Sequence, residues 1–102
     1  MFFFSFHAVP KSDSDHAKAF AGAYVNCWID FKNLHGARRL AEFSIEDEGW
    51  DITKLDRELE TGREFYKGSE EDFLYFEEAE RDGWSFVYNT YGHDAPDKND
   101  DE

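Results

Sequence analysis

The segment from Ala23 to Phe31 constrains the fold more than any other part of this chain. Every second residue in it is apolar, while the residues between them are mixed and include Tyr24 and Trp28. Since successive side chains of a β-strand point to opposite faces of a sheet, this alternation predicts a strand with one buried face. The rings on its second face indicate that this side is partly covered as well, either by the chain itself or by a partner.

Two other segments have the composition of strands, and a third is ambiguous. Phe2 to Val9 is rich in β-forming residues and ends at Pro10, and Trp84 to Tyr91 alternates rings with other side chains. Between residues 50 and 66 the apolar spacing fits both a strand and one stripe of a helix. We favour a strand there.

Two helices are predicted from their end signals. Asn33 can cap a helix over residues 34 to 48, where apolar residues recur every three or four positions until Gly49. Ser69 to Asp72 resembles a capping box at the start of a second helix, and Gly83 stands where a left-handed C-terminal cap belongs.

The predicted order is strand, strand, helix, strand, helix, strand. This order predicts an α+β two-layer sandwich, with a mainly antiparallel sheet of about four strands and two helices on one face. In outline it resembles the ferredoxin-like arrangement. We expect residues 1–92 to form a single α+β domain. Residues 93–102 form an acidic tail with almost no apolar content, which predicts disorder.

The single cysteine bears on the compartment. Cys27 is the one cysteine among 102 residues, so the chain cannot form an intramolecular disulfide, which suits a reducing cytosol. The apolar start has no preceding basic region and is too short for the core of a signal peptide. No stretch approaches the roughly 18–20 apolar residues of a membrane-spanning helix. We therefore expect a soluble cytoplasmic protein.

The charge balance excludes several classes of partner. The chain carries 24 acidic and 11 basic residues, a net charge of -13, and Arg38 and Arg39 are its only adjacent basic pair. A polyanionic backbone or an acidic membrane surface would repel such a chain, so we expect neither nucleic acid nor membrane as a partner. Basic proteins and cationic ligands remain compatible with this charge, which also keeps an aromatic-rich chain in solution.

No residue pattern predicts a catalytic, cofactor or metal site. Cys27 falls on the more apolar face of its strand, where a thiol is inert, and the histidines fall on separate elements: His7, His16, His35 and His93. A cluster of His7, Cys27 and His35 lacks the closely spaced ligand pairs of structural zinc sites. The carboxylates are spaced as solvated helix faces, and no glycine-rich loop could hold a phosphate.

One group of rings is a candidate interaction surface. Tyr and Trp are favoured at protein contacts because each combines a large apolar area with a polar group. The candidates lie on the alternating strand and on the last strand, and carboxylates from the second helix and from residues 51 to 60 would surround them: Tyr24, Trp28, Trp84, Tyr88 and Tyr91.

These observations predict a small, acidic, non-enzymatic domain that binds a basic protein or itself, with a homodimer as the simplest version. One alternative is an inhibitor or immunity-type protein for a basic nuclease, whose acidic surface would replace the phosphates of the substrate. The other is a small-ligand-binding or enzymatic domain with a pocket between sheet and helices, using His7, Cys27, Tyr24 or Asp30.

Overall fold

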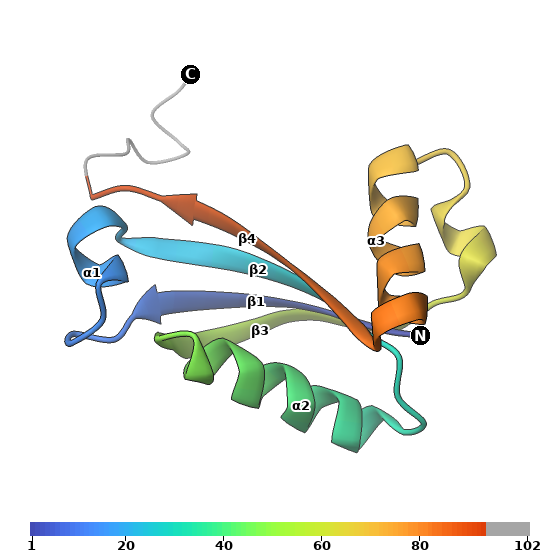
Figure 1. The fold of residues 1–102 in the computed structure, drawn as a ribbon, viewed down its shortest axis with the longest axis horizontal. Helices are drawn as coiled ribbons and strands as arrows, with labels where there is room; N and C mark the ends of the chain where they lie inside the picture. The colour runs from blue at the N-terminus through green and yellow to red at the C-terminus, as the bar shows by residue number, and fades with distance from the viewer. Residues whose placement is uncertain (94–102) are drawn as a thin grey trace.

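The structure, a computed structural model, describes residues 1–93 (Figure 1). Its elements follow one another as β1 (Phe2–Pro10), α1 (His16–Ala19), β2 (Gly22–Ile29), α2 (Leu34–Asp47), β3 (Trp50–Glu60), a 3-10 turn η1 (Arg63–Tyr66), α3 (Glu70–Asp82) and β4 (Trp84–Tyr91). The ambiguous segment after residue 50 is therefore a strand as predicted, and η1 follows it. Of the predicted tail, residues 94–102 lie outside the described residues, whereas the ring Nε2 of His93 hydrogen-bonds the carbonyl of Ala17.

The four strands form one sheet in the order β3-β1-β2-β4, with every neighbouring pair antiparallel. β2 and β3 therefore run in the same direction on either side of β1, and α2 connects them across it. This split β-α-β connection is the feature shared with the ferredoxin-like outline. The predicted α+β class, with a mainly antiparallel sheet of four strands, is confirmed.

The helix end signals were largely correct. The Asn33 side chain accepts a hydrogen bond from the Gly36 N–H at 2.7 Å, which satisfies one of the unpaired donors of the first turn of α2. Gly49 and Gly83 both have φ of 97°, the left-handed conformation that ends a helix. The predicted capping box at Ser69 is not formed, because this side chain makes no cap hydrogen bond. The short helix α1 was not predicted, since it has no buried residue and hence no apolar stripe.

The first face of the sheet packs against α2. Alternate residues of β1 and β2 lie on this face with no exposed surface, among them Phe4, Phe6 and Val25. The small residues Ala37 and Ala41 of α2 let the helix approach them closely, and Trp50 closes one end of the cluster. Burying side chains of this size contributes about 1.5–3 kcal/mol each, so this cluster is the main core.

The second helix lies on the opposite face, which corrects the prediction of two helices on one face. α3 packs over Trp28, on the other side of β2, and its Phe76 and Ala79 are buried there with Tyr66. Figure 1 shows α2 extending along the sheet and α3 at the end of the sheet where β4 begins. The physical reason is that the second face carries large aromatic side chains, and burying them requires an element packed on that side of the sheet. This cover comes from the chain itself.

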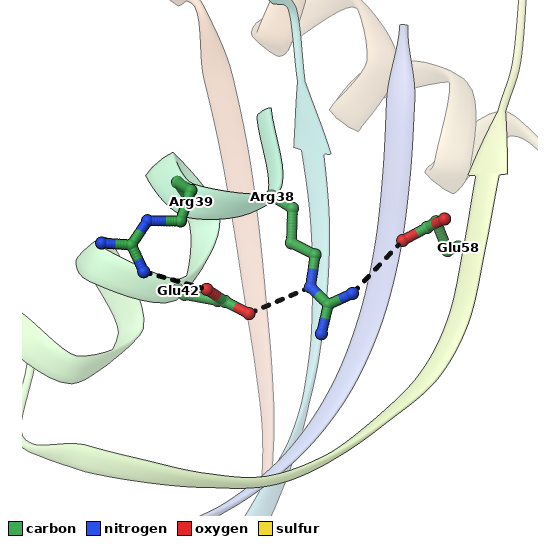
Figure 2. A network of polar contacts seen from close by, with 4 residues as sticks. All are labelled: Arg38, Arg39, Glu42 and Glu58. Carbon is green, nitrogen blue, oxygen red and sulfur yellow. Dashed lines mark hydrogen bonds and ion pairs between the residues drawn. The ribbon is translucent and has the colours of Figure 1, made fainter. Parts of the chain in front are cut away.

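A network of exposed ion pairs links α2 to the edge strand β3. Arg38 Nε donates to Glu42 Oε2 at 3.0 Å, and Arg38 Nη1 lies 3.8 Å from Glu58 Oε1 on β3 (Figure 2). Arg39 Nη1 lies 3.8 Å from the other oxygen of Glu42. Exposed pairs of this kind contribute little stability, but they show which flank of α2 faces β3. The opposite flank faces β4.

Candidate functional site

Among residues 1–93, α2 does not extend over the part of its sheet face that β4 forms, and α1 borders this part only at the far end, beside Tyr88 and Thr90. α2 approaches β3, β1 and β2, but none of its Cα atoms lies within 8 Å of a Cα of β4, both elements being wholly described. A four-stranded sheet is about 19 Å wide, since strands are about 4.8 Å apart, whereas one helix is about 10 Å across. One helix therefore covers about half of the sheet, and α3, which could have covered the rest, is on the other face.

The uncovered part is a groove of about 520 Å³ between α2 and β4. One wall is a stripe on α2 with helical spacing, and the other is one face of β4. Five of the eight described lining residues are apolar or aromatic, and none of the eight is basic. The lining residues are Leu40, Phe43, Ser44, Asp47 and Glu48 from the helix side, and Trp84, Phe86 and Tyr88 from β4.

Large apolar side chains of this groove are open to solvent. Phe43 is 70% exposed and Trp84 is 47% exposed, and they stand on opposite walls. Single exposed apolar residues are common on protein surfaces, but a continuous groove of them marks a contact site. Phe43 was not among the predicted site residues. Its signal was present, because it falls outside the apolar stripe that α2 buries through Ala37, Ala41 and Ile45.

The groove is acidic at the end where α2 stops. Glu46, Asp47 and Glu48 follow one another there, beside the negative end of the helix dipole, and α2 has no basic residue in its last turn. None of the three forms an ion pair with another residue in the range 1–93. The pKa of Lys11 is raised mainly by its ion pair with Asp51, at 2.8 Å, and the charge of Glu46 is a smaller cause. This run of carboxylates is unfavourable for α2 and favourable for a bound cation.

The aromatic wall adjoins this acidic end. Burial raises the pKa of Tyr88, with smaller contributions from the Cys27 thiol and the Glu48 carboxylate, and Glu48 lines the same groove as Tyr88. Past Tyr88 the groove adjoins a smaller hollow that shares Glu48 and Tyr88 and is otherwise lined by His16, Phe20, Trp50 and Thr90. The His16 ring Nε2 hydrogen-bonds the Glu48 carbonyl at 3.0 Å, which partly compensates the open end of the helix.

The structure divides the five predicted interaction residues between the two faces of the sheet. Trp84 and Tyr88 lie on the α2 face and line the groove. Tyr24, Trp28 and Tyr91 lie on the α3 face, where Trp28 is 2% exposed and belongs to the second core cluster. The five residues do not form one surface.

His7 is part of a polar cluster on the α3 face, together with two of those tyrosines. Its Nδ1 and Nε2 lie 2.6 Å from Thr53 Oγ1 and Tyr91 Oη respectively, and its ring centroid is 4.9 Å from that of Tyr24. The Thr53 hydroxyl donates to the His7 carbonyl, so it accepts from Nδ1–H. Gly22 has no side chain that would collide with the Tyr91 ring. Both ring nitrogens of His7 are therefore already occupied.

The other candidate chemical groups are separated. Cys27 points to the α2 face, away from His7, and Asp30 lies in the exposed segment after β2. His35 is exposed at the start of α2, so the sheet and the helix keep His7, Cys27 and His35 apart. Within residues 1–93, no three His, Cys, Asp or Glu side chains form a group that could hold a metal ion.

A smaller pocket of about 180 Å³ lies on the α3 face. Trp28 and Tyr66 line it together with two opposite charges, Arg57 and Asp72. Arg57 lies over the ring of Phe3, 5.9 Å from its centroid. Sites for drug-sized ligands usually enclose about 300–1,000 Å³, so this pocket is small for that purpose.

Cys27 is expected to be unreactive in the folded protein. The thiol has no exposed surface, and burial raises its pKa above the ordinary value of about 8.5, which disfavours the reactive thiolate. At neutral pH, labelling by a maleimide should proceed only as fast as the chain unfolds, and 6 M guanidinium should make it immediate. Fast labelling of the native chain would contradict the buried position.

No family model, curated protein or solved structure matches this chain. None of the helices in residues 1–93 is long and apolar enough to cross a bilayer. The candidate site therefore depends on its own geometry: an open apolar groove with carboxylates at one end, formed by one helix and one edge strand.

Proposed function

We propose that this chain is a non-enzymatic protein-interaction domain that binds a basic protein in the groove between α2 and β4. The observation that carries the proposal is that large aromatic side chains, Phe43 and Trp84, are exposed on opposite walls, next to carboxylates that form no ion pair within residues 1–93. Interfaces combine these features, since aromatic side chains supply affinity and charges supply orientation and rate of association.

The groove suits a protein segment better than a small molecule. Small-molecule sites enclose their ligand and hold it by several converging polar groups. Here the charged lining groups are Asp47 and Glu48, both on the helix side, and the β4 wall presents aromatic rings whose polar groups are the Trp84 N–H and the Tyr88 hydroxyl. Such a surface binds by apolar contact along its length.

The charge of the chain favours a basic partner over a second copy of itself. The net charge of -13 makes two copies repel each other, and the unpaired carboxylates of one copy would face those of the other. A partner rich in Lys and Arg would be attracted at long range and would compensate the charges of Asp47 and Glu48 on binding. Such attraction weakens as salt is added.

The test compares proteins captured from source-cell lysate by the wild-type chain and by a groove variant, Phe43→Ser with Trp84→Ser. We expect the wild type to retain a basic protein, with weaker retention in high salt. For the partner identified by mass spectrometry and then purified, the groove variant should bind at least about 30-fold more weakly by calorimetry, since hot-spot residues contribute about 2 kcal/mol or more.

The matched control is Phe65→Ser with Leu74→Ser. These side chains are 60% and 63% exposed but lie outside the groove, so this variant should bind like the wild type. Equal losses in both variants, or a captured protein that is acidic, would contradict the proposal. Light scattering that shows a dimer abolished by the groove variant would assign the groove to a second copy instead.

A further inference from the structure

The shape of the groove identifies the kind of segment that fills it. This inference rests on the proposed function and deepens it. We infer that the partner contributes an amphipathic α-helix of about 9–13 residues. This helix lies beside α2 and over β4, with its apolar stripe in the groove and Lys or Arg residues next to Asp47 and Glu48.

The width of the vacant space is that of one helix. α2 lies toward β3 and β1, and β4 is two strand spacings, about 10 Å, from β1. Packed helices keep their axes about 8–10 Å apart. A helix over β4 would therefore lie at packing distance from α2 and would complete a layer of two helices on this face of the sheet. α3 cannot fill this place, because it is packed on Trp28 on the other face.

The walls have the spacing that a helix needs. Leu40, Phe43, Ser44 and Asp47 follow the i, i+3, i+4, i+7 pattern of one helix flank, and this flank presents a ridge to a neighbouring helix. The buried Ala37, Ala41 and Ile45 set the rotation of α2, since turning the helix would expose them. The ion pairs of Arg38 show that the opposite flank faces β3 (Figure 2).

The length of the groove sets the length of the helix. From Trp84 to Tyr88 the β4 wall extends about 13 Å, and the adjoining hollow carries it to Thr90, about 20 Å in all. A helix rises about 1.5 Å per residue, so these lengths correspond to about 9 and 13 residues. A helix of this size is only marginally stable alone, so it would form fully on binding.

An extended segment fits the groove less well. The outer edge of β4 has no neighbouring strand in the described sheet, and a partner strand could pair with it. That strand would lie in the plane of the sheet, beyond β4 and about 4.8 Å further from α2. It would leave Phe43 and the inner side of the groove uncovered. Pairing at the β4 edge is therefore the rival outcome.

The experiment titrates the ¹⁵N-labelled full chain with two synthetic peptides of identical Leu and Lys composition. In one peptide the leucines follow the i, i+3, i+4, i+7 spacing of a helix, and in the other they alternate as in a strand. We expect the helical peptide to bind at one site, with amide shifts confined to residues 40–48 and 84–90. Its circular dichroism should gain helix on binding, and the alternating peptide should bind at least about tenfold more weakly.

Two chain variants test the contacts. Phe43→Ser should weaken the binding of the helical peptide at least about tenfold. Phe65→Ser, which is similar in exposure but lies outside the groove, should leave this binding unchanged. Asp47→Lys should weaken the binding of the lysine peptide. It should not change the binding of a peptide in which glutamine replaces lysine. Since Phe43 is mostly exposed, its replacement should leave the urea midpoint of unfolding close to that of the wild type.

The outcomes distinguish a failure of the helix inference from a failure of the proposed function. If the alternating peptide binds as tightly and shifts the amides of β4 but not those of α2, the helix inference fails while the interaction role of this region stands. If both peptides bind without regard to Phe43 and shift amides over the whole acidic surface, or if neither binds, the helix inference and the proposed function both fail.

Discussion

Replacing Trp28 with alanine is expected to lower the free energy of unfolding by about 3–5 kcal/mol, as for other buried large rings. The ring is 2% exposed and packs between Phe3 and Tyr75, with centroid distances of 5.1 and 5.2 Å. Its Nε1–H donates to Tyr66 Oη at 3.0 Å, and that hydroxyl is 2.9 Å from Thr61 Oγ1. The ring therefore holds η1 and α3 to the sheet. Urea denaturation followed by circular dichroism measures the loss.

Trp28→Phe is the matched control for this prediction. It keeps most of the ring packing and removes the N–H donor, while Tyr66 keeps its hydrogen bond with Thr61. We expect a loss of about 1–2 kcal/mol, close to the contribution of one buried hydrogen bond. A loss within about 1 kcal/mol for the alanine variant would contradict the core position and return Trp28 to the candidate interaction surface.

Local patterns predicted most of the fold because strands and helix ends leave local signals. The alternation after Ala23, the cap at Asn33 and the left-handed glycines at 49 and 83 each depend on neighbouring residues in the chain. The face chosen by α3 does not, since the chain between two edge strands can cross either side of the sheet. The rings of Trp28 and Phe3 favour the face that α3 occupies, because α3 buries them there.

The candidate site was harder to predict because it depends on what remains uncovered. Residue type alone does not place Tyr and Trp side chains on one surface: Tyr88 and Tyr91 are an odd number of positions apart and so lie on opposite faces of β4. The apolar stripe of α2 indicates the residues that pack on the sheet, and Phe43 lies outside that stripe, so the stripe does not indicate a role for it. An apolar residue on another flank of the same helix is the signal that would have indicated the groove.

Trp50→Ala is the second substitution with a large expected effect, again about 3–5 kcal/mol. Trp50 is 2% exposed at the start of β3, and its ring centroid is 4.9 Å from that of His16, 6.4 Å from that of Phe20 and 6.0 Å from that of Tyr88. The ring therefore joins α1, the edge of the core and the aromatic wall of the groove. Its removal should destabilise the whole chain and also release the Tyr88 side chain.

Trp84→Ala is the comparison that isolates the effect of burial. Both substitutions remove an indole in or next to the groove, but Trp50 is buried and Trp84 is half-exposed. Trp84 is 47% exposed, so its loss should cost only about 1 kcal/mol while weakening partner binding. Trp50→Ala should show the reverse balance, a large loss of stability and, in the fraction that remains folded, a smaller loss of binding through Tyr88. Equal stability losses for the two variants in urea denaturation would show that Trp50 is not a core residue. In that case another residue would have to hold the Tyr88 side chain in the wall of the groove.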